Sequence, residues 1–235
     1  MKDNDFDVKK HFNSEKANDY DSIIRQIIPG YEAMHDMVRI YLQERLGGGA
    51  EVLVAGVGTG QEAVSYGVNN PGWRITGFDQ AETMLSIASE RIRENHLEER
   101  VELIEGSINA VGQDHCYDAA TSLLIMHFIP DNGEKYEFLM EIFNRLKPGG
   151  IIALVDLTGD KNSIIYEKFM AEMKGWQLEF RADKEQVEED MAHITRQVDT
   201  ISQNRTEELL SKAGFVNIRQ FYQAYLFCGY FAEKL

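Results

Sequence analysis

Short apolar runs alternate with helical patterns along the middle of the chain, from about residue 51 to 156. This alternation is typical of a parallel sheet covered by helices. The apolar runs predict five strands, at Glu51–Ala55, Arg74–Asp79, Val101–Glu105, Tyr117–Leu123 and Gly150–Asp156. The segments between them predict helices at Glu62–Asn69, Ala81–Asn95 and Lys135–Leu146, the last one stopped by the Pro and Gly of "LKPGG".

Helical patterns also flank this core. Residues 18–46 predict one or two helices interrupted at Pro29-Gly30, and residues 161–213 predict a long helical stretch. Thr206 is the expected N-cap of a last helix that Gly214 closes. An apolar stripe with 4-3-4-3 spacing favours packing onto the domain over a coiled-coil partner, because it spans too few heptads. Its members are Val187, Met191, Ile194, Val198 and Ile201.

The C-terminal segment "FVNIRQFYQAYLFCGYFAEKL" is rich in aromatic and β-branched residues. Such residues are enriched in strands, and the segment predicts two of them. Strands joined by a short turn pair antiparallel. We therefore expect a single domain whose mostly parallel sheet of five strands ends in an antiparallel pair.

Composition is that of an ordinary globular protein, with 43% hydrophobic and 27% charged residues. Acidic residues number 39 against 24 basic ones, which gives a net charge of −15. Such a surface repels nucleic acid and anionic lipid, so we expect neither as a partner. The N-terminus lacks the pattern of an export or transit signal, and no apolar segment reaches the roughly 18 residues of a membrane span. These observations predict a cytoplasmic protein.

The familiar motifs of nucleophilic and metal catalysis are absent from the sequence. There is no G-x-S-x-G and no H-E-x-x-H. Cys116 and Cys228 lie far apart and lack metal-ligand spacing, so we predict two reduced core thiols and no metal site.

A glycine-rich loop follows the first predicted strand. Gly56, Gly58 and Gly60 stand at every second position, and Asp79 ends the second strand 19 residues after Gly60. A carboxylate there accepts hydrogen bonds from ribose hydroxyls. Gln61 occupies the last position of the dinucleotide pattern G-x-G-x-x-G, which disfavours a nicotinamide-dependent dehydrogenase.

Four motifs in this order resemble those of the class I S-adenosylmethionine-dependent methyltransferases: the glycine loop, Asp79, "RLKPGG" and "LLSKAGF". The resemblance covers roughly residues 18–235. It implies an α/β, Rossmann-like, doubly wound sheet of seven strands in the order 3-2-1-4-5-7-6, with strand 7 antiparallel. It also implies the organisation of the domain: an N-terminal helical cap at 1–46, a cofactor-binding core at 47–156, a helical lid insertion at 157–213 and a C-terminal β-hairpin at 214–235.

The resemblance implies S-adenosyl-L-methionine as methyl donor and S-adenosyl-L-homocysteine as product. Carried over residue by residue, Gly56, Val57 and Gly58 would line the methionine moiety. Gly60 belongs to the same loop, and Asp79 would bind the ribose hydroxyls.

The adenine end of the cofactor has counterparts as well. Gln80 and Met84 would lie beside the adenine. Ser107 and Ile108 occupy the position where many members have an acid that contacts the adenine amino group. A serine hydroxyl can still hydrogen-bond there, more weakly. Leu123 would contribute its backbone carbonyl at most.

Val54 departs from the family pattern. Many members have Asp or Glu two residues before the first glycine, where it helps to hold the ammonium group of the cofactor. Valine makes no such hydrogen bond. The sequence therefore predicts retained but weaker cofactor binding, which Val54→Asp would test.

Residues 20–31, "YDSIIRQIIPGY", resemble the N-terminal region of the carboxy-S-adenosyl-methionine synthases. There the tyrosine of Pro-Gly-Tyr contacts cofactor, which makes Tyr31 a candidate. Those enzymes also need an arginine that pairs with the extra carboxylate, and an ungapped alignment puts Met191 at that position. Arg196 lies one turn away. Plain methyl transfer is favoured over carboxy-cofactor synthesis, in which prephenate would be the second substrate.

Methyl transfer from a sulfonium needs aligned reactants and no nucleophilic side chain. His127, just past the fourth strand, is a candidate proton acceptor, although a lone histidine there more often has a structural role. "LLIMHFIPD" at this point is similar to many small-molecule methyltransferases. We predict methyl transfer to a small-molecule acceptor. The alternatives are an enzyme like the carboxy-S-adenosyl-methionine synthases and a non-catalytic adenosylmethionine-binding protein, and a homodimer is left open.

Overall fold

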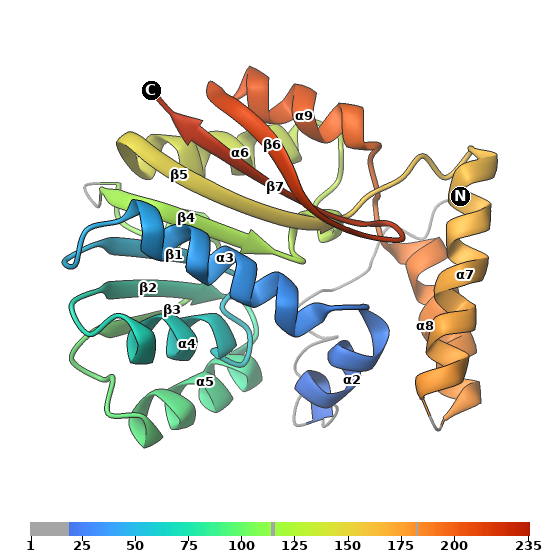
Figure 1. Ribbon diagram of the computed structural model, residues 1–235, viewed down its shortest axis with the longest axis horizontal. Helices are drawn as coiled ribbons and strands as arrows, with labels where there is room; N and C mark the ends of the chain where they lie inside the picture. Colours follow the sequence, from blue (N-terminus) through green and yellow to red (C-terminus); the bar gives the residue numbers. More distant parts are fainter. Residues whose placement is uncertain (1–18, 114–115, 182) are drawn as a thin grey trace.

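The computed structural model describes residues 19–113, 116–181 and 183–235. Its centre is a seven-stranded sheet in the order β3-β2-β1-β4-β5-β7-β6 (Figure 1). The strands are β1 (Glu51–Ala55), β2 (Arg74–Asp79), β3 (Val101–Glu105), β4 (Tyr117–Leu123), β5 (Leu146–Leu157), β6 (Phe215–Ala224) and β7 (Phe227–Lys234). The first five pair in parallel, and β7 is antiparallel to both β5 and β6. The predicted fold class, strand order and antiparallel hairpin are confirmed.

Helices cover both faces of this sheet. They are α2 (Tyr20–Ile27), α3 (Tyr31–Arg45), α4 (Gln61–Asn69), α5 (Glu82–Glu94), α6 (Glu134–Arg145), α7 (Ile164–Phe180), α8 (Lys184–Gln197) and α9 (Gln203–Lys212), with short 3-10 turns η2 (Ile108–Ala110) and η3 (Met126–Phe128). One hydrophobic cluster joins α3 and α4 to one face of the sheet, and a second joins α6 and α9 to the other. Helices α7 and α8 lie side by side beyond one end of the sheet, near α2 (Figure 1).

Strand β1 shows why a central strand of the sheet is a continuous apolar run in the sequence. Its residues from Val52 to Ala55 are fully buried, as expected for a parallel strand covered on both faces. Val52 and Val54 belong to the cluster under α3 and α4, whereas Leu53 and Ala55 belong to the opposite one. The side chain of Val54 therefore faces the same layer as α4.

The N-terminal pattern predicted an interruption at Pro29-Gly30, and two helices meet there. Gly30 has a φ of 72° and caps α3. Trp176 of α7 donates its indole N–H to the Gln26 carbonyl at 3.0 Å, and the Tyr222 hydroxyl donates to the Pro29 carbonyl. The N-terminal helices are thus tied both to α7 and to the C-terminal hairpin.

The long helical stretch predicted at 161–213 consists of three helices. The first ends at Phe180, the second runs from Lys184 to Gln197, and the third begins at Gln203. Val198 and Ile201 lie beyond the end of α8, so the predicted stripe is helical only as far as Ile194. Both residues are nevertheless buried. They are apolar because they pack in the core, and not because they belong to a helix face.

The expected cap at Thr206 was wrong. Ser202 caps α9, since its hydroxyl accepts a hydrogen bond from the Arg205 N–H at 3.2 Å. Thr206 lies inside α9 and donates its hydroxyl to the Ser202 carbonyl. Serine is an equally good N-cap, and the acids after Thr206 had drawn the prediction one turn too far.

Two further expectations are corrected. Strand β5 begins at Leu146 rather than Gly150, because Leu146 pairs with Tyr117 before the register shifts ahead of Ala119. Cys228 is a buried free thiol as predicted, but Cys116 is exposed.

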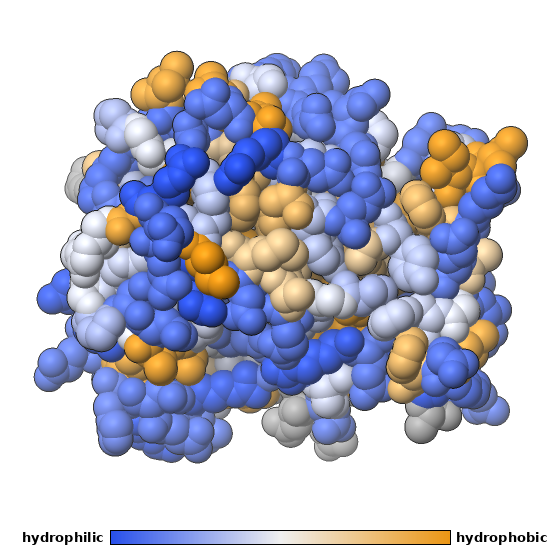
Figure 2. All heavy atoms as spheres, in the orientation of Figure 1, coloured by the Kyte–Doolittle hydropathy of each residue, from blue (hydrophilic) through white to orange (hydrophobic). Residues whose placement is uncertain are grey.

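The surface is mostly hydrophilic on the face seen in Figure 2. Apolar atoms gather at the end of α7 where the chain enters that helix, and Ile164 and Ile165 there are 70% and 66% exposed. Among the helices of the described residues, none combines the length and the apolar character that crossing a membrane requires.

Candidate cofactor site and active site

A cavity opens where the order of the sheet reverses, between β1 and β4. Its volume is about 580 Å³. Residues at the ends of four neighbouring strands line it, namely 56–59 after β1, 78–80 of β2 and its loop, 106–109 after β3 and 123–125 at the end of β4. The carboxyl ends of parallel strands beside such a reversal form the usual ligand crevice of a doubly wound sheet. This cavity is therefore the candidate site.

Most of the predicted cofactor residues line this one cavity. They are Tyr31, Gly56, Val57, Gly58, Asp79, Gln80, Met84, Ser107, Ile108 and Leu123. Gly60 and His127 are not among the lining residues.

The glycines of the loop serve different purposes. Gly56 has a φ of 68°, and a Cβ atom there would lie 2.1 Å from the Cδ1 atom of Ile125. Gly60 has a φ of 83°, and its Cβ atom would lie 3.0 Å from the Cβ atom of Ala88 in α5. Gly56 thus permits the close approach of the β4 loop at the cavity, whereas Gly60 lets α4 begin against α5.

The Asp79 carboxylate is held by the backbone. Its Oδ2 atom accepts a hydrogen bond from the Gly58 N–H and its Oδ1 atom accepts one from the Ala81 N–H, both at 2.9 Å. Burial raises the pKa of the carboxyl, and these N–H groups oppose that shift. Each carboxylate oxygen retains further acceptor capacity, so Asp79 can bind two hydroxyl groups of a ligand.

Glu62 is a second carboxylate at the cavity, and sequence reasoning missed it. It lies in the first turn of α4 and is 6% exposed. Its Oε1 atom accepts hydrogen bonds from Thr121 Oγ1 at 2.7 Å and from the Tyr66 hydroxyl at 3.2 Å. Burial raises the pKa of this carboxyl to about 7. An acid that precedes Tyr66 by four residues on an otherwise buried helix face was the available signal.

His35 of α3 also lines the cavity and was missed. Its ring lies edge-on to that of Tyr31, with 4.4 Å between the centroids. The Nε2 atom is buried and has no hydrogen-bond partner among the described residues. Burial lowers the pKa of His35 to about 4, so the imidazole is neutral at physiological pH.

Helix α2 is fastened over the glycine loop by a cluster of polar contacts. Thr59 donates its hydroxyl to Asp21 Oδ1 at 2.8 Å, and Arg91 forms an ion pair with Asp21 Oδ2. Arg91 also donates to the Thr59 carbonyl at 3.2 Å. Arg25 donates to the Gln61 side chain at 3.1 Å. We call these contacts the α2 clasp.

His127, the predicted proton acceptor, is buried beside β5. Its Nδ1 atom contacts Asp156 Oδ1, and its backbone N–H donates to the same oxygen at 3.0 Å. Its carbonyl accepts a hydrogen bond from the Asp199 N–H. These contacts join the β4 loop to β5 and to the segment between α8 and α9.

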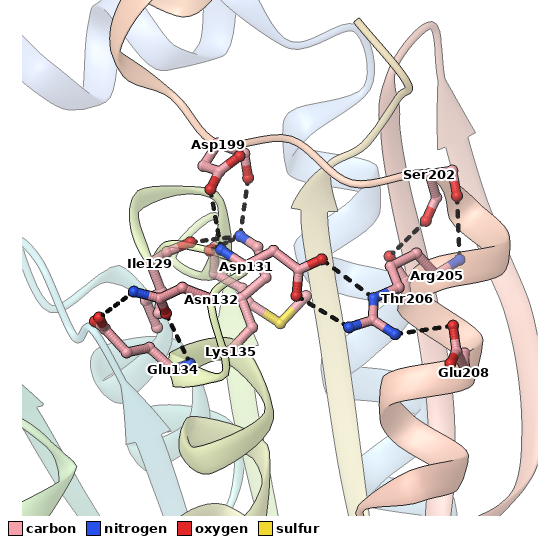
Figure 3. A network of polar contacts seen from close by, with 11 residues as sticks. Ile129, Asp131, Asn132, Glu134, Lys135, Asp199, Ser202, Arg205, Thr206 and Glu208 are labelled. Carbon is pink, nitrogen blue, oxygen red and sulfur yellow. Dashed lines mark hydrogen bonds and ion pairs between the residues drawn. The ribbon is translucent and has the colours of Figure 1, made fainter. Parts of the chain in front are cut away.

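Figure 3 shows a second junction between the same parts of the chain. The Lys135 ammonium is buried and donates to the carbonyls of Met126, Ile129 and Asp199 at 2.6, 2.6 and 2.8 Å. Arg205 of α9 donates two hydrogen bonds to the Asp131 carboxylate, at 3.1 and 3.3 Å. The loop that lines the cavity after β4 is thus anchored to the segment between α8 and α9.

The charged residues that line the cavity are all acidic. Glu62 and Asp79 lie near the glycine loop, and Glu134, Glu137 and Glu141 lie along α6. The described lining residues include no lysine or arginine. Met191, the aligned position of the synthase arginine, is buried in α8, and Arg196 is exposed in the last turn of that helix.

The fold and the cavity define a doubly wound α/β protein with a site for a ribose-containing cofactor. Residues 52–150 match the family model described as a methyltransferase domain. Over 221 residues the chain is 22% identical to a demethylmenaquinone methyltransferase of Lactobacillus johnsonii, and the alignment covers 88% of each chain.

Two other similar proteins are covered less fully. The chain is 25% identical over 140 residues to a carboxy-S-adenosyl-L-methionine synthase of Chromohalobacter salexigens, which is 57% of this chain but only 50% of that protein. It also resembles, with a TM-score of 0.65 and 18% identity, a phosphoethanolamine N-methyltransferase 2 of Haemonchus contortus solved with S-adenosylhomocysteine. That likeness covers 92% of this chain and 46% of the other.

The matching domain and the Lactobacillus johnsonii relative make the chain similar to the class I S-adenosylmethionine-dependent methyltransferases. The residues of the cavity fit S-adenosyl-L-methionine, the cofactor of those enzymes. Gly56 leaves no room for a side chain at the loop, and Asp79 keeps acceptor capacity for a ribose.

Proposed function

We propose that this enzyme transfers the methyl group of adenosylmethionine to a small molecule bound in the cavity beside the glycine loop. One observation carries the proposal. The glycine loop, Asp79 and the ends of β3 and β4 converge on a single cavity that Tyr20, Tyr31 and His35 of the N-terminal helices also line. The cavity thus adjoins both the cofactor residues and an aromatic wall.

The cofactor, when bound, supplies an activated methyl group on its sulfonium. The residues of this chain then bind, orient and exclude water. Asp79 accepts hydrogen bonds from the ribose hydroxyls. Gln80, Met84, Ser107 and Ile108 surround the adenine. Leu123 offers its backbone carbonyl.

We propose His35, rather than His127, as the group that receives a proton from the acceptor. His35 lines the cavity with a neutral imidazole whose Nε2 atom has no partner among the described residues, whereas His127 is engaged by Asp156. Loss of a general base costs about 10²- to 10⁴-fold in rate. His35→Gln should therefore lower kcat to that extent and leave adenosylhomocysteine affinity unchanged, and His193→Gln in the lid serves as the matched control.

The charge of the cavity favours a neutral or cationic acceptor. Five acidic side chains and no lysine or arginine line it in the part of the chain that the structure describes. An anionic acceptor such as prephenate, or a carboxylated cofactor, would lack the bidentate partner that arginine provides. This supports plain methyl transfer over the carboxy-cofactor alternative.

Thermal unfolding tests the cofactor and the class of activity together. Saturation with adenosylhomocysteine at about 100 times its Kd should stabilise the protein by about 2.7 kcal/mol, or roughly 5–10 °C in Tm, whereas NAD should not. Assays with neutral and amine acceptors should then yield methylated product. Formation of a carboxylated cofactor from prephenate would contradict the proposal. Tight cofactor binding without turnover across the panel would favour a non-catalytic binding protein.

A further inference from the structure

Glu62 is a buried acid that forms no ion pair with any described residue. It is 6% exposed, and its two hydrogen bonds come from neutral hydroxyl groups, those of Thr121 and Tyr66. Within residues 19–113, 116–181 and 183–235 no lysine, arginine or histidine forms an ion pair with it. Buried carboxylates are normally paired, so a missing cation calls for an explanation.

The position of Glu62 suggests where that cation comes from. The residue lies two positions after Gly60, at the start of α4, and it lines the same cavity as Gly56, Val57 and Gly58. The amino end of a helix stabilises a negative charge, which keeps an ionised carboxylate accessible there. A cationic group of a ligand beside the glycine loop would meet this carboxylate first.

Glu62 also reaches the place from which an acid at position 54 would act. Thr121, which donates to Glu62, is the register partner of Val54 in the pairing of β1 with β4. Val54 is fully buried and belongs to the layer beneath α3 and α4. The carboxylate from α4 therefore lies beside the strand position that is apolar in this chain.

We propose that Glu62 binds the α-ammonium group of the cofactor's methionine moiety, in place of an acid at position 54. The proposal rests on the cofactor assigned above. Hydrogen bonds from Thr121 and Tyr66 to Oε1 fix the carboxylate, and Oε2 accepts none from a described residue. Glu62 thus has one oxygen anchored and one open to a cation. It replaces the expectation, drawn from Val54 alone, that cofactor binding is weak.

Ligands that differ in the amino acid part test this role. Adenosylhomocysteine carries the ammonium and carboxylate, its decarboxylated analogue keeps only the amine, and 5′-methylthioadenosine has neither. Calorimetric affinities at pH 8 are compared for the wild type and Glu62→Gln. We expect the substitution to weaken adenosylhomocysteine and the analogue about 10- to 100-fold and to change methylthioadenosine less than about twofold. Glu90→Gln, at an exposed position of α5 that does not line the cavity, is the control.

Two results would overturn the proposal. One is an unchanged affinity of Glu62→Gln for adenosylhomocysteine. The other is an equal loss for methylthioadenosine, which would mean that Glu62 only supports the loop. Failure of the wild type to bind any of these ligands would instead refute the cofactor assignment itself, so the two failures are distinguishable.

A double variant moves the acid to the strand. Glu62→Gln with Val54→Asp should regain part of the lost affinity for adenosylhomocysteine, because the carboxylate then approaches the same ammonium from β1. Val54→Asp alone should bring no gain, since it would place two carboxylates side by side. A tenfold gain from Val54→Asp alone would show that no carboxylate serves the ammonium in the wild type.

Discussion

At the scale of single residues, Glu62 should weaken the folded protein whenever the cavity lacks a cation. Burial raises its pKa to about 7, so the folded state binds the proton more tightly than the unfolded state does. Stability conferred by the protonated acid is therefore present at low pH and is lost as pH rises towards and through about 7. The hydrogen bonds that Thr121 and Tyr66 donate to the carboxylate oppose this rise in pKa without cancelling it.

Glu62→Gln should accordingly stabilise the ligand-free protein at pH 8 by about 1–3 kcal/mol, a few degrees in Tm. The gain should shrink at pH 5.5, where the wild-type carboxyl is itself mostly protonated. Thermal unfolding at both pH values measures it, with Glu137→Gln as the control. A gain of equal size at the two pH values would mean that ionisation of Glu62 is not its cause.

At the scale of helices and strands, the junctions of Figure 3 differ in how deeply they are buried. Lys135 is fully buried, and its ammonium satisfies three carbonyl groups from two segments. Burial lowers the pKa of Lys135, and the nearby carboxylates of Asp156, Asp199 and Asp131 oppose that shift. Arg205 pairs with Asp131 in a more exposed position, where ion pairs contribute little.

Lys135→Met should therefore cost about 2–4 kcal/mol of unfolding free energy, because it orphans three acceptors while nearly preserving volume. Arg205→Met should cost less than about 1 kcal/mol. Urea unfolding of the two variants makes the comparison. Equal losses of unfolding free energy would mean that the Arg205–Asp131 ion pair contributes as much to stability as Lys135 does.

The sequence predicted the sheet and the position of the glycine loop well because both are local. Continuous apolar runs mark parallel strands buried on two faces, and Asp79 follows directly from its place at a strand end. The helices of residues 161–213 were predicted less well. No glycine or proline marks the end of α7 at Phe180 or of α8 at Gln197, and the local signals are the N-caps Asp183 and Ser202 of the helices that follow.

Glu62 and His35 were harder to predict as residues of the cavity. Each lies on a helix whose apolar periodicity predicts which face is buried. The periodicity does not predict which layer or cavity that face contacts. Only the pairing of β1 with β4 brings Thr121 beside Val54 and so within reach of Glu62. Likewise α3 places His35 at the cavity only because Pro29-Gly30 turns the chain there.

At the scale of the whole molecule, the N-terminal helices complete a cavity that the sheet alone would leave open. Tyr20 and Tyr31 come from α2 and α3, and the former helix contacts α7. The Trp176 and Tyr222 hydrogen bonds tie these helices to α7 and to the C-terminal hairpin. Parts of the chain far apart in sequence therefore hold the N-terminal helices in place at the cavity.

The α2 clasp also has a consequence for the timing of turnover. A cofactor bound beside the glycine loop, as proposed above, would lie under a helix held by Asp21, Thr59 and Arg91. Release of adenosylhomocysteine would then require the α2 clasp to open, which makes release slower than methyl transfer. A rapid-quench time course should therefore show a burst of methylated product before a slower steady rate. Arg91→Met should shorten the residence of adenosylhomocysteine and erase the burst. A linear time course from the wild type would mean that the clasp opens faster than the methyl group moves.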